Sequence, residues 1–131
     1  MSMMKQENLG YDFQVEISTT YLAQHSSETE EQYAFAYTVT ITNRGSFPAQ
    51  LISRHWIITD AMETIQEVRG PGVVGEQPLL FPGESFEYTS GAVVSTPVAT
   101  MQGEYVMITE DGREFMIEVP QFMLAVPRTL H

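Results

Sequence analysis

The stretch 33-YAFAYTVTIT-42 decides the fold of this chain. Large apolar side chains occupy every second position from Tyr33 to Ile41, and alanines and threonines lie between them. A period of two places alternate side chains on opposite faces of a strand, as in a half-buried strand of an antiparallel sheet. The stretch therefore predicts a strand that turns one face toward a core.

Similar runs follow one another along the chain. We expect strands at 13–21, 33–42, 49–60, 64–69, 84–91, 100–109 and 114–119, with an extended tail at 120–131. The run 49–60 has large side chains on both faces, so we expect it to be a central strand of its sheet, with Trp56 in the core. No segment combines a helical period with a capping motif. The pattern predicts an all-β, immunoglobulin- or fibronectin-III-like antiparallel β-sandwich of about seven or more strands, and a closed barrel is the alternative.

Length and composition bound the class of protein. A chain of 131 residues predicts one domain, which we place at 11–131 behind a flexible N-terminus at 1–10. The chain has no cysteine, so disulfides and thiolate zinc sites are excluded. The first ten residues lack the apolar core of a signal peptide, and no window is apolar enough to span a membrane. We expect a cytoplasmic protein without membrane binding.

The charge balance argues against nucleic-acid binding. Seventeen acidic residues oppose six basic ones, which gives a formal net charge of −11, and the arginines are scattered rather than clustered. Such a chain repels polyanions at long range. The three histidines also lie far apart, without the spacing of metal ligands. We therefore expect no nucleic-acid partner, no metal site and no cofactor.

One glycine-rich run has the spacing of a dinucleotide-binding turn, G-x-G-x-x-G. The run is 70-GPGVVGEQP-78, and its glycines are Gly70, Gly72 and Gly75. The nucleotide motif requires a helix directly after the glycines, and Pro78 prevents a continuous helix here. Pro71 also removes one amide donor from any phosphate cradle. We interpret the run as a loop that crosses between two sheets.

An alternative is that this loop turns its amides toward a phosphate with help from Arg69 or Arg54. A catalytic site is less well supported. Ser53 and His55 share a strand face but are too far apart to form a nucleophile–base pair unaided, and no G-x-S-x-G motif is present. We expect a protein that is not an enzyme.

Several blocks of the chain together resemble one known family. The blocks are 37-YTVTITN-43, 53-SRHWIITDA-61, 72-GVVGEQP-78, 82-PGE-84, 88-YTSG-91 and the ending 120–131. In order and spacing they resemble the ApaG family over nearly the whole chain. The resemblance implies a fibronectin-III-like β-sandwich and a role without established catalytic activity. In related eukaryotic proteins the domain is similar to a protein-interaction module, and the family is loosely associated with cobalt and magnesium tolerance.

The first functional hypothesis is a non-enzymatic interaction domain with an unidentified protein partner. We expect the partner to meet a sheet edge or the loop 70–78, with Arg54 and His55 nearby, because open sheet edges recruit other strands. A homodimer through a sheet edge is a further expectation. The alternative is a small-ligand binder that uses the loop for a nucleotide phosphate or a divalent cation such as magnesium or cobalt.

Overall fold

The computed structural model describes residues 10–127, so the expected flexible N-terminus lies outside the described residues except for Gly10. These residues form strands and one short 3-10 helix, η1. The elements are β1 (Phe13–Tyr21), η1 (Ala23–His25), β2 (Tyr33–Asn43), β3 (Ala49–Asp60), β4 (Ile65–Pro71), β5 (Leu79–Leu80), β6 (Ser85–Val94), β7 (Val98–Thr109) and β8 (Glu114–Ala125).

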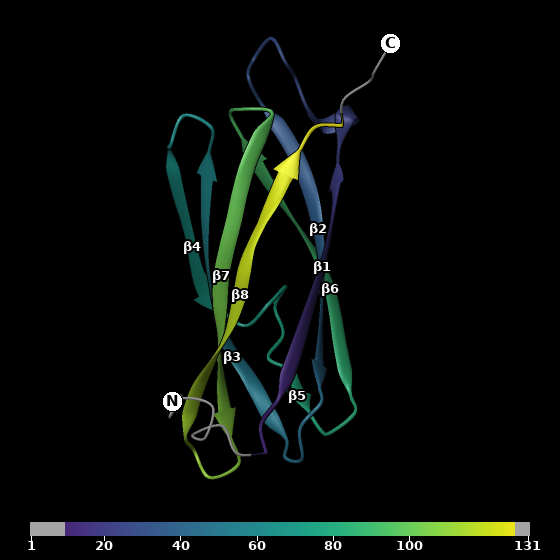
Figure 1. Ribbon diagram of the computed structural model, residues 1–131, viewed down its shortest axis with the longest axis vertical. Helices are drawn as coiled ribbons and strands as arrows, with labels where there is room; N and C mark the ends of the chain where they lie inside the picture. Colours follow the sequence, from purple (N-terminus) through teal and green to yellow (C-terminus); the bar gives the residue numbers. More distant parts are fainter. Residues whose placement is uncertain (1–9, 128–131) are drawn as a thin grey trace, which may run out of the picture.

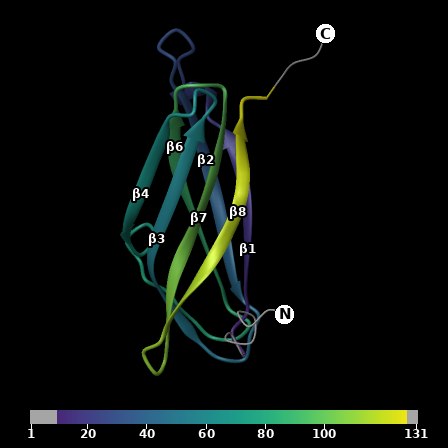
Figure 2. The same ribbon diagram turned by 60° about the vertical axis from the view of Figure 1, so that its left-hand side comes forward.

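The strands form two sheets, as Figures 1 and 2 show. One sheet has the order β1-β2-β6, and the other has the order β4-β3-β7-β8 with β5 also paired to β3. Every strand pair is antiparallel. The structure confirms the predicted antiparallel β-sandwich and excludes the closed barrel. It also confirms that β3 is central, because β7 lies on one side of it and β4 and β5 lie on the other.

The largest differences from the predicted strands concern β8 and β5. β8 continues to Ala125, although we expected the strand to end before Pro120. The register of β7 and β8 shifts between Met101 and Gly103, so Pro120 and Gln121 both lie opposite one residue of β7. Proline has no main-chain N–H to donate to the neighbouring strand, and a bulge of this kind tolerates that loss. The second difference is β5, whose two residues are too few to produce a periodic pattern.

Trp56 of β3 is the centre of the core and is 1% exposed, as predicted. Its ring makes edge-on contacts with Tyr37, Tyr105 and Phe122, at centroid distances of 5.6, 5.9 and 5.9 Å. Gly103 of β7 is the Cα partner of Trp56 and lies directly beneath the ring. A Cβ atom at Gly103 would be 2.7 Å from the ring and 2.3 Å from the His55 carbonyl oxygen. The tryptophan therefore packs only because this position is a glycine.

A buried pair of hydroxyl groups joins the two sheets across the core. The hydroxyls of Tyr88 in β6 and Tyr105 in β7 are hydrogen bonded to each other. Burial raises the pKa of Tyr88 to about 12 and raises the pKa of Tyr105 further. Both side chains are therefore neutral at physiological pH, and the pair adds no buried charge.

Replacement of Gly103 by alanine tests the packing beneath Trp56. We expect Gly103→Ala to lower the free energy of unfolding by about 1–3 kcal/mol, because the new Cβ overpacks the core against the main chain. Gly91→Ala in β6 is the matched control, since its Cβ would meet only ordinary contact at 3.4 Å. Urea unfolding of both variants measures the difference. Equal stabilities would contradict this account of the core.

Candidate functional site

The glycine-rich loop lies between β4 and β5 and interrupts one edge of the five-stranded sheet. β4 pairs with residues 53–59 of β3, and β5 pairs with residues 49–50 on the same side. The loop therefore does not cross between the sheets, and our prediction on this point is wrong. The two residues of β5 return the chain to the edge of β3 first, and the crossing follows between β5 and β6.

The loop is anchored by its own amides and by one buried side chain. Val73 is fully buried in the core, and its amide and that of Glu76 donate to each other's carbonyls at 2.8 and 2.9 Å. This pair closes a turn in which Val74 and Gly75 have φ values of +42° and +82°. The amide of Gly72 donates to the Ile52 carbonyl at 2.7 Å. Three amides of the loop thus serve the fold itself.

Arg54 lies beside this loop on the core-facing side of β3. It shares that side with Trp56, because alternate residues of a strand face the same way. Its Nη1 donates to the carbonyls of Pro71 and Gly72 at 3.2 and 2.9 Å. The guanidinium packs on Gly70, where a Cβ would come within 3.0 Å of Nη1. Gly70 therefore makes room for Arg54.

His55 and Arg69 lie on the opposite, outer face of the sheet. His55 Nε2 hydrogen bonds to Glu67 of β4 at 2.9 Å, and its Nδ1 is 3.9 Å from Glu104 of β7. Arg69 contacts the same Glu67 carboxylate at 3.4 Å. The hydrogen bond from His55, supported by Arg69, holds the pKa of Glu67 below its usual value. The predicted site residues thus form two groups, one on each side of β3 and β4.

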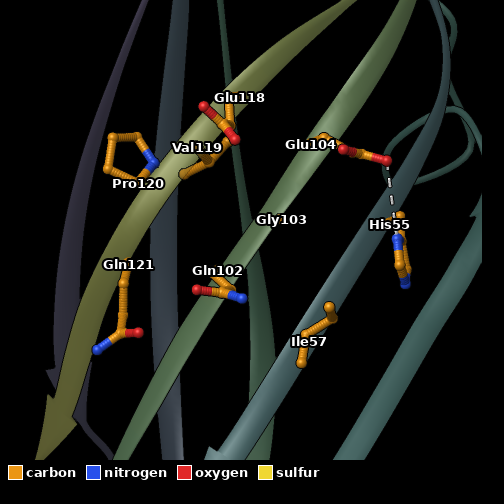
Figure 3. A pocket seen from close by; sticks show the side chains of 9 residues that line it. All are labelled: His55, Ile57, Gln102, Gly103, Glu104, Glu118, Val119, Pro120 and Gln121. Carbon is orange, nitrogen blue, oxygen red and sulfur yellow. Dashed lines mark ion pairs between the residues drawn. The ribbon is translucent and has the colours of Figure 1, made fainter.

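A shallow hollow of about 420 Å³ adjoins His55 on this outer face. Figure 3 shows it over β3, β7 and β8, beside the bulge at Pro120 and Gln121. Glu104 and Glu118, which are Cα partners, line it together with Gln102. Across residues 10–127, no three His, Cys, Asp or Glu side chains are placed to hold a metal ion.

The free edge of β4 is the main feature that our sequence interpretation did not identify. The main-chain amide of Gly72 donates to the Ile52 carbonyl, and the amide of Asp60 donates to the Thr64 carbonyl. These two bonds establish which residue pairs of the β3–β4 ladder are hydrogen bonded. Since these pairs alternate in an antiparallel ladder, the even-numbered residues of β4 bond to β3. The main-chain N–H and C=O groups of Ile65, Glu67 and Arg69 therefore point away from the sheet.

No other strand of the described chain pairs with this edge. In Figures 1 and 2, β4 forms the outer margin of the ribbon. Ile65 and Val68 are 60% and 37% exposed along it. The sequence did contain a signal for such an edge: a short strand that carries Glu67 and Arg69 and ends at Pro71, since charges and proline are typical of edge strands.

Comparison with known proteins identifies the family. The model of the ApaG domain matches residues 23–109. The chain belongs to the ApaG family. ApaG proteins from Thiobacillus denitrificans and Ralstonia nicotianae are each 58% identical to it, and the matches cover 95% and 92% of this chain and 98% of each relative.

A solved ApaG-family structure has the same fold. The crystal structure of an ApaA protein from Bordetella pertussis superposes with a TM-score of 0.89 at 55% identity, covering 92% of this chain and 98% of that one. Within residues 10–127 of the present ApaG chain, no helix is long and apolar enough to cross a membrane.

The amide bonding in the loop predicts how this ApaG chain responds to phosphate ligands. We expect melting temperatures to change by less than about 1 °C with ATP, GTP or diadenosine tetraphosphate, because three loop amides are already engaged. We expect the same with magnesium or cobalt, because no three potential metal ligands come together within residues 10–127. Differential scanning fluorimetry measures the response, with Arg54→Gln and Arg69→Gln as companion variants. A dose-dependent rise of several degrees that either substitution abolishes would contradict the expectation.

Proposed function

We propose that this ApaG chain is a non-enzymatic, cytoplasmic protein-interaction domain that binds an extended segment of another chain at the edge of β4. The observation that supports the proposal is the outward main chain of Ile65, Glu67 and Arg69, which has no partner strand within residues 10–127. Strand addition to such an edge satisfies these groups and extends the sheet.

The side chains of β4 supply the selectivity that main-chain bonds lack. Trp56 and Val68 are Cα partners, so Val68 lies on the core-facing side of the edge. Glu67 and Arg69 lie on the outer side and present one charge of each sign. An added strand would therefore meet an apolar contact on one side and charged contacts on the other. Hydrogen bonds from His55 and Arg69 hold the Glu67 carboxylate in place.

The glycine-rich loop bounds this docking edge. Pro71 pairs with Ser53 in the ladder as an outward-facing residue, and it has no N–H to offer an added strand. Beyond it, Val74 is 53% exposed at the tip of the loop although its φ is positive. A β-branched residue in that conformation is strained, and strain is concentrated at functional positions. We propose that Val74 contacts the partner next to the added strand.

A ligand-binding function of the loop is the second candidate. One observation favours it: no carboxylate of the described chain lies within ion-pair distance of Arg54, whose bonds go to carbonyl groups. A phosphate or carboxylate ligand would supply the missing negative charge. The engaged amides of the loop make this candidate weaker than strand addition.

Two proline substitutions test strand addition. Glu67→Pro removes an outward N–H of β4 without breaking a main-chain bond to β3, and it also removes the carboxylate that bonds to His55. Glu87→Pro likewise removes an outward N–H at the edge of β6, because Asn43 donates to Glu84 and the odd-numbered residues of β6 therefore face outward. Linear peptides selected on the wild-type protein from a displayed library are the probe. We expect Glu67→Pro to weaken their binding by at least about tenfold and Glu87→Pro to leave it unchanged.

Circular dichroism establishes that both proline variants are folded before binding is compared. Peptides that bind Glu67→Pro as tightly as the wild type would contradict the proposed use of β4. A loss confined to Glu87→Pro would move the docking edge to β6.

A further inference from the structure

We infer that the strand which the edge of β4 fits best is β4 of a second copy of this chain. The inference rests on the proposed function, because it requires that β4 accepts an added strand. Two copies would pair β4 with β4 in antiparallel fashion about a two-fold axis. The two five-stranded sheets would then form one continuous sheet, and the open edge of each would be closed by the other.

Two-fold symmetry leaves few registers for such a pair. Outward-facing residues must face outward-facing residues, so Glu67 can lie opposite Ile65, Glu67 or Arg69 of the second copy. Glu67 opposite Glu67 places like charges together, which destabilises a strand pair. Glu67 opposite Ile65 places Arg69 beyond the start of the second strand. Glu67 opposite Arg69 creates two opposite-charge pairs, because symmetry repeats the contact.

The core-facing side favours the same register. Between the two charge pairs, Val68 lies directly opposite Val68 of the second copy, so two partly exposed valines would be buried together. Gln66 then faces Gly70 of the second copy. Gly70 has no side chain, and the Arg54 guanidinium packs against it. The amide oxygen of Gln66 would therefore meet a hydrogen-bond donor there.

The acidity of the chain does not oppose this contact. The formal net charge of −11 belongs to the whole molecule, whereas β4 contains one glutamate and one arginine and is locally balanced. Repulsion between more distant charges is screened over about 8 Å at physiological ionic strength. The docking contact is thus attractive over short distances even though the two copies carry the same net charge.

Charge-swapped variants test the register directly. Glu67→Arg alone would place two arginine side chains opposite each other in each facing pair, and Arg69→Glu alone would place two glutamate side chains there. When the two variants are mixed, both facing pairs become complementary. Glu87→Arg on the edge of β6 changes the net charge by the same amount as Glu67→Arg and is the matched control. Sedimentation equilibrium in 150 mM salt, from about 10 µM to 1 mM protein, measures the dissociation constants.

We expect the wild type and Glu87→Arg to dimerise with the same dissociation constant. Each single β4 variant should dimerise at least about tenfold more weakly, and the equimolar mixture should recover the wild-type value within about threefold. A wild type that is monomeric at 1 mM would overturn the inference. So would variants that the mixture does not rescue. If selected peptides still bind through β4 in that case, the proposed function stands and only the identity of the partner is wrong.

Discussion

The packing of Trp56 on Gly103 is the contact on which the rest of the structure depends. It buries the largest side chain of the chain between the sheets and thereby fixes which face of β3 is inward. Because side chains alternate along a strand, Arg54 must then lie inside and His55 outside. Paired residues of neighbouring strands face the same way, so Val68 of β4 faces inward like Trp56, and Glu67 and Arg69 face outward. One core contact thus determines the chemistry of a distant edge.

The structure concentrates its stability in the core and its binding capacity at its margins. β3 is paired on both sides, whereas β4 is mostly exposed and, within residues 10–127, pairs on one side only. The glycine-rich loop adds to this division. Val73 ties it to the core while Val74 projects from it in a strained conformation. Pairing with β3 and the buried Val73 already hold the backbone of this edge in place. Few residues of this chain would therefore have to become ordered when a strand is added.

Alternation in the sequence was sufficient to predict the sandwich, the central position of 49–60 and the burial of Trp56. It could not predict β5, because two residues have no period, or the continuation of β8 past Pro120, because the bulge depends on a neighbouring strand. The separation of Arg54 from His55 follows from alternation alone. That β4 is an edge is a property of sheet order, for which its charges and Pro71 are only an indirect signal in the sequence. Residues such as Glu67 gain their role only from that order.

The central claim is that the main chain of β4 is free on one side, and amide hydrogen exchange tests it most directly. In dilute protein, where copies do not meet, nuclear magnetic resonance can follow each amide of β4 separately. The account predicts strong protection at Gln66, Val68 and Gly70 and protection below about tenfold at Glu67 and Arg69. Equal protection of both sets at dilution would contradict it, because the outward amides would then already have partners within a single chain.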